Sequence, residues 1–467
     1  VSGVSDYLAE NEIDAFRVAR EIVEYLDCGK PHFIPENNFV SPKFSTEELL
    51  GVVPFNPKTP FDIRELIARI IDNSNFSEFK KEYGNTMVTG WAKIHGYPLG
   101  IIANNGVIFS ESANKATQFI QLSNKNNVPI LFINNTSLTN LTCYMNSITS
   151  LDVSVNSALT SLKANSNQIS TLDLSNNTNL IALGCSNNNL TSLDVTNNTA
   201  LTEIECGGDD NQQFAALDVS NNTSLYKLYC GSLGLSTLDV SANTNLHILQ
   251  CQQNSFTTLD VSANTALTEL NCGNNQLTSL DVSNNTALTY LHCDGNPLTS
   301  LDVSSNIALT TLKCRNNQLT SLDVSNNTAL SILFCQGNQL TSLDVSSNPA
   351  LVNLNCPDNL LTSLDVSSNT DLGALDCGTN QLTSLDVSSN TALHTLICVS
   401  NPLTYLNMKN GLTDQLSTFN ATGNSSLTCI ETLDPAYATA NWTLANGNIG
   451  AGVTFDVICG AAVRTHW

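Results

Sequence analysis

The sequence predicts an α/β chain in two parts, a short N-terminal α/β segment followed by a solenoid of about thirteen stacked coils. Three observations support this prediction. The motif LDVS, or a close variant, returns with a fixed period of 21 residues. Apolar residues within each period alternate with polar ones, as in short strands. The period is absent before residue 134, where the apolar spacing becomes helical in places.

The repeat is most regular at the aspartate of its LDVS motif. This aspartate stands at positions 152, 173, 194, 218, 239, 260, 281, 302, 323, 344, 365 and 386. The single longer step separates Asp194 from Asp218, and the Gly- and Asp-containing stretch 207–213 predicts a loop that bulges from one coil.

Each repeat contains two alternating segments. Leu291 and Cys293 flank one polar position, and Leu301 and Val303 flank another. Period-two alternation predicts that both segments are strands with one buried face. An Asn follows each segment, and its amide can satisfy backbone groups at the turn. Because one coil cannot bury its own leucines, the coils must stack, about 4.8 Å apart.

The full motif, LxxLxCxxNxLxxLDVSxN, resembles the 21-residue class of bacterial leucine-rich repeats known as the IRREKO type. The resemblance covers residues 134–428, with Ala164 in place of the Cys in one unit and the insertion after Cys206 as departures. It implies a binding or scaffold protein that takes a protein or glycan partner. It also implies a secreted or cell-surface location for this part.

Twelve of the cysteines occupy one repeat position: 143, 185, 206, 230, 251, 272, 293, 314, 335, 356, 377 and 398. We call them the cysteine column. A metal or redox array is one interpretation, and a row of small buried apolar side chains is the other. The sequence has no CxxC or His-paired spacing, so we favour packing and expect no metal.

Two further cysteines, Cys429 and Cys459, lie outside the cysteine column. Residues 429–467 resemble the C-terminal cap that closes many secreted repeat proteins, followed by a short tail. The resemblance implies a disulfide between these two cysteines, which would fasten the cap to the last coil. Two unrelated thiols are the alternative.

The formal charge of −23 falls mostly on the repeats. So acidic a surface repels phosphate backbones, and we expect no nucleic-acid partner. The twelve LDVS aspartates should face solvent, about one coil apart. They could attract cations, but we favour a solvated face that discourages lateral aggregation, because the clustered oxygen donors of a calcium loop are missing.

The polar position between Leu and Cys, in contrast, changes from coil to coil. We call the following residues the recognition stripe: Glu205, Tyr229, Gln250, Asn271, His292, Lys313, Phe334 and Asn355, with Tyr290 and Arg315 beside them. One uniform and one diverse segment per coil is what a recognition surface requires. Unselected drift at solvent positions would produce the same diversity, so this alternative stays open.

The segment before residue 134 has mixed α/β character. We expect helices over 8–26, 63–70 and 112–122, and strands over 86–94, 99–103, 107–110 and 128–133. No apolar run reaches the roughly 18 residues of a membrane-spanning helix, so we expect no membrane span.

Residues 1–6, 60–71, 100–106 and 109–113 closely resemble the carboxyltransferase β subunit of methylcrotonyl-CoA carboxylase and related acyl-CoA carboxylases. The resemblance implies that residues 1–133 are a truncated crotonase-like fragment from a cytoplasmic parent. It also implies that both Gly-rich oxyanion holes of the family are missing from this sequence. We therefore expect no catalytic residue, no cofactor and no carboxyl transfer, and we interpret the chain as a chimera joined near Ile133. A biotin-dependent carboxylase subunit and a purely structural stalk are the alternatives.

Overall fold

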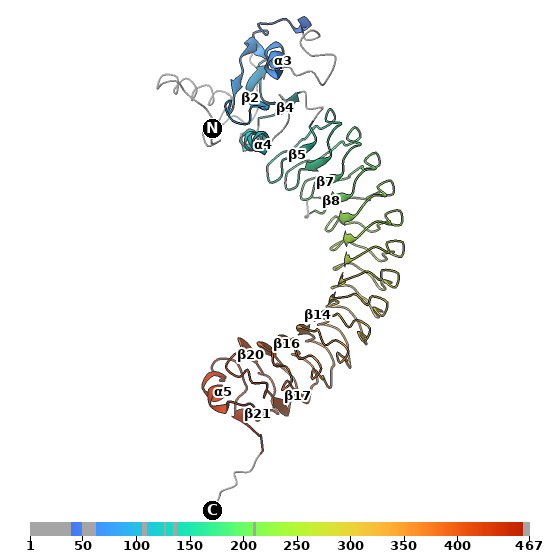
Figure 1. Ribbon diagram of the computed structural model, residues 1–467, viewed down its shortest axis with the longest axis vertical. Coiled ribbons are helices and arrows are strands. Elements are labelled where there is room, and N and C mark those ends of the chain that lie inside the picture. The colour runs from blue at the N-terminus through green and yellow to red at the C-terminus, as the bar shows by residue number, and fades with distance from the viewer. Residues whose placement is uncertain are drawn as a thin grey trace, which may run out of the picture. The chain divides into compact units, whose positions relative to one another are not determined.

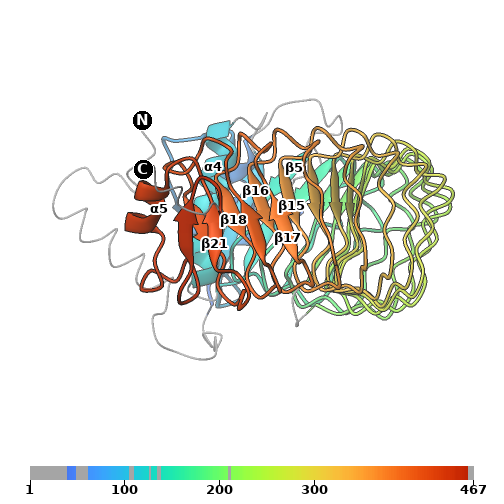
Figure 2. The same cartoon turned by 90° about the horizontal axis from the view of Figure 1, so that it is seen from below.

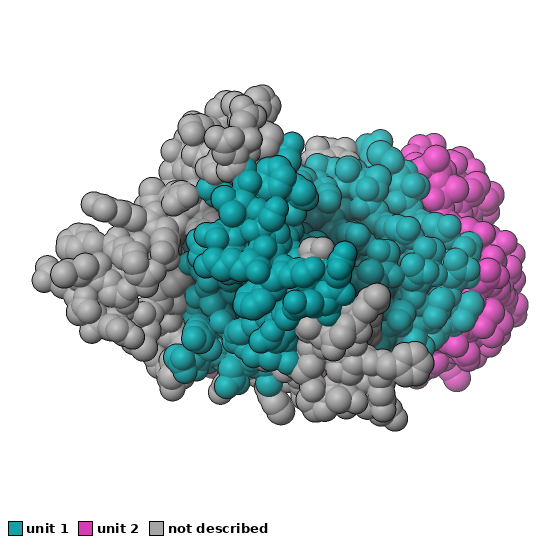
Figure 3. Space-filling view, turned by 90° about the horizontal axis from the view of Figure 1, so that it is seen from above, with its two compact units in different colours: residues 1–214 teal, residues 215–467 magenta. Residues whose placement is uncertain are grey.

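The computed structural model describes residues 39–48, 62–104, 110–125, 128–133, 138–208 and 212–460. It divides into two compact units, residues 1–214 and 215–467, which Figure 3 colours separately. The domain boundaries predicted at residues 133 and 428 fall inside these two units and stay predictions. The helix expected over residues 8–26 lies outside the described residues.

The first unit begins with a four-stranded sheet in the order β1-β2-β3-β4. Its strands are β1 Ser77–Glu78, β2 Met87–Ile94, β3 Tyr97–Asn104 and β4 Ile130–Ile133. Its helices are η1 Thr46–Glu48, α3 Ile63–Ile70, η2 Asp72–Ser74 and α4 Ser110–Lys125. The strands β1, β2 and β3 pair antiparallel, and β4 pairs parallel to β3. This arrangement confirms the α/β prediction for this segment.

Helices α3 and α4 pack against side chains that point to opposite faces of β2. Ile63 and Ile67 of α3 join a buried cluster with Val88 and Ala92. Phe119 of α4 packs on Trp91, with ring centroids 4.5 Å apart. Because successive side chains of a strand point to opposite faces, α3 and α4 cover the two sides of the sheet.

One predicted strand differs in the structure. Residues 107–109 lie outside the described residues, but Ser110, its last predicted residue, begins α4. The prediction was therefore wrong at Ser110. The apolar run that suggested a strand ends before this position, and a Ser ahead of a periodic apolar segment favours the start of a helix.

The repeats form fourteen short strands in the described coils, one in each. In the first unit they are β5 Asn140–Thr142, β6 Ser161–Lys163, β7 Ala182–Gly184 and β8 Glu203–Glu205. In the second they are β9 Lys227–Tyr229, β10 Ile248–Gln250, β11 Glu269–Asn271, β12 Tyr290–His292, β13 Thr311–Lys313, β14 Ile332–Phe334, β15 Asn353–Asn355, β16 Ala374–Asp376, β18 Thr395–Ile397 and β20 Thr418–Asn420. These strands from β5 to β18 match the predicted Leu–x–Cys segments, with the known Ala164 in the Cys position after β6, whereas β20 has Phe419 and Ala421 in the Leu and Cys positions.

Within each unit the repeat strands pair parallel and in register. In the second unit Leu249 faces Leu228 on one side and Leu270 on the other. Figure 2 shows β15, β16 and β18 of these coils side by side. A fixed 21-residue step therefore places equivalent side chains in continuous columns.

The columns of Leu, Cys and Val side chains form the core of the coils. Leu291, Cys293 and Val303 are fully buried, as are their equivalents in neighbouring coils. All twelve cysteines of the column are buried, and none of them forms a disulfide. Among the described residues, no cluster of His, Cys, Asp and Glu could hold a metal ion. Each Leu→Ala change in such a core typically costs about 2–5 kcal/mol of stability.

The LDVS segments correct a prediction, because most of them are not strands. Among the described coils only one LDVS segment pairs as a strand, β17 Ser384–Asp386. The burial alternation is as expected, with Leu301 and Val303 inside and Asp302 exposed. In the second unit, Figure 1 shows the repeat strands along the inner side of the curve and the LDVS turns along the outer side. Strand pairing requires neighbouring backbones about 4.7–4.9 Å apart, and the other LDVS segments of the described coils do not pair as strands.

Asparagine side chains replace the missing sheet hydrogen bonds between these segments. The amide of Asn285 donates to the carbonyl oxygens of Val261 and Asn264, at 3.0 and 2.8 Å. A second column serves the turn after each repeat strand, where Asn275 donates to the carbonyls of Cys251 and Cys272. The prediction that these Asn side chains satisfy backbone groups is confirmed.

The C-terminal end closes with a small parallel sheet in the order β17-β19-β21-β22. Its further elements are β19 Tyr405–Asn407, β21 Cys429–Glu431, α5 Pro435–Asn441 and β22 Thr454–Asp456. A disulfide joins Cys429 to Cys459, with Cα atoms 5.8 Å apart. Trp442 packs against Phe419 and Phe455 and covers the end of the last coil with an aromatic cluster. In the described part of the chain, no helix has the length and apolar character needed to cross a membrane.

Candidate recognition stripe

The recognition stripe lies on successive strands of the second unit. The residues at the third position of each strand lie next to one another in register. They are Tyr229, Gln250, Asn271, His292, Lys313, Phe334 and Asn355. All of them are half-buried, since each packs between its neighbours and leaves its end exposed. Glu205 holds the same position on β8, but it belongs to the first unit.

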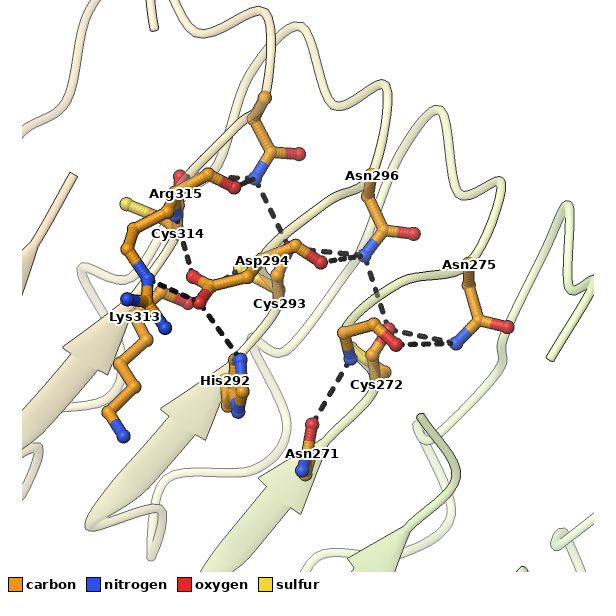
Figure 4. A network of polar contacts seen from close by, with 12 residues as sticks. Asn271, Cys272, Asn275, His292, Cys293, Asp294, Asn296, Lys313, Cys314 and Arg315 are labelled. Carbon is orange, nitrogen blue, oxygen red and sulfur yellow. Dashed lines mark hydrogen bonds and ion pairs between the residues drawn. The ribbon is translucent and has the colours of Figure 1, made fainter. Parts of the chain in front are cut away.

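The centre of the stripe is a polar network around Asp294 (Figure 4). The Asp294 carboxylate accepts hydrogen bonds from Arg315 Nε at 2.6 Å and from the Arg315 backbone N–H at 2.7 Å. His292 Nε2 lies 3.0 Å from the same carboxylate. The Asp294 side chain is 8% exposed, whereas that of Arg315 is 33% exposed. A largely buried carboxylate therefore anchors two side chains that reach the surface.

The electrostatics of Asp294 favour its charged form. Burial raises the pKa of this carboxyl, but the hydrogen bonds from His292 and from the backbone and side chain of Arg315 outweigh burial. The pKa is lowered below its ordinary value as a result. The carboxylate thus stays ionised near neutral pH and holds Arg315 by charge-assisted bonds, which are about twice as strong as neutral ones.

Cations and aromatic rings alternate beside this network. The Lys313 ammonium lies 5.4 Å from the Tyr290 ring centroid and 5.9 Å from that of Phe334. The Arg315 guanidinium lies 5.5 Å from the same Phe334 ring. Both cations therefore converge on one aromatic side chain, in the range of cation–π attraction.

Further along the stripe, hydrogen bonds join residues of adjacent strands. Gln250 Nε2 donates to Glu269 Oε1 at 2.7 Å. Asn355 Nδ2 lies 3.5 Å from Asp376 Oδ2. Outside the predicted stripe, Tyr226 stacks on His247 with ring centroids 4.2 Å apart. The surface is thus a row of mutually supported polar and aromatic side chains.

Sequence reasoning found the exposed residues but missed Asp294, the residue that organises them. A signal was present, because Asp294 and Arg315 are separated by 21 residues, which is one coil. Opposite charges at one repeat length occupy neighbouring positions in a stack of this period. Searching the repeats for charge pairs at that offset would have identified the network.

The aspartates of the LDVS motif have a structural role in the turn. Asp344 Oδ1 accepts the backbone N–H of Ser346 at 2.9 Å, and the same bond recurs in coil after coil. Hydrogen bonds from the Ser346 side chain and backbone lower the pKa of Asp344. All twelve aspartates are exposed, as expected. Because an Asx turn requires such an acceptor, local folding explains their uniformity without a ligand.

Comparison with known proteins assigns the two parts of the chain to two classes. A family model of the carboxyl transferase domain matches residues 1–137. A model of leucine-rich repeats matches residues 265–306. The chain is a chimera, in which a partial carboxyl transferase domain precedes a leucine-rich-repeat solenoid.

Two curated relatives each match less than a third of the chain. A probable biotin-dependent acyl-coenzyme A carboxylase beta2 subunit of Mycobacterium tuberculosis is 53% identical over 138 residues, 29% of this chain and 26% of the relative. The biotin-dependent 3-methylcrotonyl-coenzyme A carboxylase beta1 subunit of the same organism is 47% identical over 134 residues, 29% of this chain and 25% of the relative. The chain thus spans about a quarter of the length of these relatives.

Solved structures match the repeat part. The functional domain of InlJ from Listeria monocytogenes, which includes a cysteine ladder, has a TM-score of 0.59 at 31% identity over 76% of this chain and 75% of that chain. The protein LIC12759 of Leptospira interrogans has a TM-score of 0.55 at 20% identity over 76% of this chain and 88% of that chain, which shows the fold alone. These likenesses confirm the predicted fold class.

Proposed function

We propose that the chain is a recognition protein whose stripe on β9 to β15 binds a protein partner. The observation that carries this proposal is the cluster of Tyr290, Lys313, Arg315 and Phe334, in which Asp294 holds Arg315. Aromatic and Arg side chains dominate the energetics of protein interfaces when their conformations are fixed beforehand. The in-register strands supply that rigidity, because their backbones do not depend on which side chains they carry.

The test is selection of binders from a displayed random-peptide library on the full chain. A stripe variant carries Tyr290→Ser, Lys313→Ser and Phe334→Ser. A matched control carries Asp323→Asn, Asp344→Asn and Asp365→Asn on the opposite side of the coils. We expect the selected peptides to lose binding to the stripe variant and to keep it for the control. Peptides that bind both variants equally would contradict the proposal, and binders found only on a glycan array would favour a glycan partner.

We further infer that the carboxyltransferase-like segment does not transfer carboxyl groups. The first described residues after β4, from residue 138, already belong to repeat coils, so the described chain after β4 does not contain the Gly-rich oxyanion donors implied by the resemblance. Loss of one such donor typically costs about 2.7–4 kcal/mol of transition-state stabilisation. The test supplies the full chain with a carboxybiotin donor and 3-methylcrotonyl-CoA. Turnover above the protein-free background would overturn this inference.

A further inference from the structure

We propose that Arg315 and Lys313 form a subsite for a single carboxylate, which an Asp or Glu side chain of the protein partner occupies. This inference rests on the proposed function and names the chemistry that the stripe recognises. The subsite lies over the ring of Phe334, where both cations converge. It is separate from the LDVS aspartates, which serve the turns.

Two neighbours restrict the guanidinium of Arg315: Asp294 binds its Nε edge, and the Phe334 ring lies beside it. Its Nε atom and its backbone N–H are bound to Asp294, and its plane lies near the Phe334 ring. Neither of its Nη atoms has a hydrogen-bond partner among the residues that the structure describes. Figure 4 shows Arg315 reaching across to Asp294 with these two atoms at its end. Two adjacent donors in a fixed plane match the two oxygens of one carboxylate.

Lys313 supplies a second charge on the same face. Lys313 and Arg315 flank the buried Cys314, so their side chains leave the strand in the same direction. Lys313 forms no ion pair with any described residue, and its ammonium sits between the rings of Tyr290 and Phe334. A cation held by aromatic faces still has its hydrogen-bond donors available to an anion.

The charge balance of the surroundings favours one carboxylate over a polyanion. The described coils and cap contain five Lys and Arg residues: Lys163, Lys227, Lys313, Arg315 and Lys409. Lys409 is already paired with Glu431. Asp294 offsets part of the charge at the subsite, and the surrounding solenoid is acidic. One small positive spot can attract a singly charged group, whereas a phosphorylated or sulfated chain would meet repulsion on every side.

The experiment uses peptides selected from the displayed library on the full chain, resynthesised with a fluorescent label. We expect the selected peptides to be enriched in Asp and Glu. Arg315→Lys keeps the positive charge but removes the two adjacent Nη donors. This change should weaken peptide binding by about tenfold or more. Replacing the Glu on which peptide binding depends by Gln should weaken binding to the wild-type chain to a similar extent. The same peptide change should have little effect on binding to the Arg315→Lys variant. This peptide change leaves the folding of the protein untouched.

Lys163→Ala is the matched control, because Lys163 holds the same strand position on β6. Its neighbours in register there are Thr142 and Gly184, which provide no aromatic ring. Binding should be unchanged in this variant and weaker in Lys313→Ala. Addition of salt should weaken binding of the acidic peptides to the wild-type chain.

Each other outcome separates the two proposals. Neutral peptides that still require the stripe would overturn the carboxylate subsite and leave the proposed function in place. Peptides that ignore the stripe, or a library that yields no binder, would overturn both. Tighter, Arg315-dependent binding of a phosphopeptide or of a heparin fragment would replace the carboxylate by a more highly charged anion and overturn the subsite as stated.

Discussion

The two long sides of each coil differ more than their sequences suggest. Both have an apolar–polar–apolar segment, Leu–x–Cys on one side and Leu–Asp–Val on the other, and both bury the apolar residues. On the first side the backbones of adjacent coils bond to one another, so the exposed side chain is free to vary. On the second side the Asn and Asp side chains hold the turns, so they recur in nearly every coil. Diversity is therefore found where the backbone alone maintains the fold.

The largest expected difference between the two sides appears at high pH, because only the strand side lies over the buried thiols of the cysteine column. Burial raises the pKa of the Cys272 and Cys335 thiols from 9.0 to about 12. A raised folded pKa gives stability that is complete below the unfolded pKa and is lost as pH rises toward the folded one. The solenoid should lose stability steeply between about pH 9 and 12, with many such thiols contributing.

Thermal unfolding followed by circular dichroism, at steps from pH 7 to 11, measures this loss. Replacing Cys272, Cys293 and Cys314 by Ala should lower the melting temperature at pH 7 and flatten its dependence on pH above 9. A wild-type melting temperature that does not change up to pH 11 would show that the thiols are not held in an apolar environment. In the native state at pH 8, a thiol reagent should label the column slowly.

The second prediction compares two asparagines of one coil. Asn348 donates to the carbonyls of Val324 and Asn327, whereas Asn353 lies on the strand face. Asn348→Ala leaves two buried carbonyls without these donors and should destabilise the chain by about 2–4 kcal/mol. Asn353→Ala should stay within about 0.5 kcal/mol of the wild type. Urea unfolding of both variants measures the contrast, and equal effects would refute the distinction between the two sides.

The third prediction concerns acid and the turn aspartates. Hydrogen bonds lower the folded pKa of Asp344, so its contribution is present above the unfolded value of 3.8 and is lost as pH falls through the folded value. Stability should therefore decline below about pH 4, as the aspartates protonate together. Asp344→Asn retains an acceptor oxygen and should match the wild type at pH 7, whereas Asp344→Ala should be less stable. Urea unfolding at pH 7 and 3 tests both statements, and equal stability of the two variants at pH 7 would argue against the turn bond.

The smallest expected effect on stability is at the recognition stripe itself. Lys313 stands on a half-buried strand position whose backbone is paired on both sides. Lys313→Ala should change the free energy of unfolding by no more than about 0.5 kcal/mol, while it weakens peptide binding. A large loss of stability would mean that the residue serves the fold, and the contrast between the two sides would then fail at the proposed site.

Much of this protein follows from its sequence alone. The 21-residue period fixes which side chains share a column, and the alternation of Leu, Cys and Val fixes which of them are buried. Both are local properties, because the direction of a side chain depends on its own backbone. The same holds for the N-terminal elements, where the apolar spacing at Ile63 and Ile67 located α3.

The tertiary structure decided what depends on distances between coils. The Leu–Asp–Val segment has the alternation of a strand, yet it pairs as one only at Ser384–Asp386 in the described coils. Elsewhere Asn side chains, and not paired backbones, link these segments between coils. The role of Asp294 also depends on stacking, because its hydrogen bonds to Arg315 form only when one coil is stacked on the next. A single repeat specifies its inward and outward faces, but spacing and contact between repeats arise only in the assembled stack.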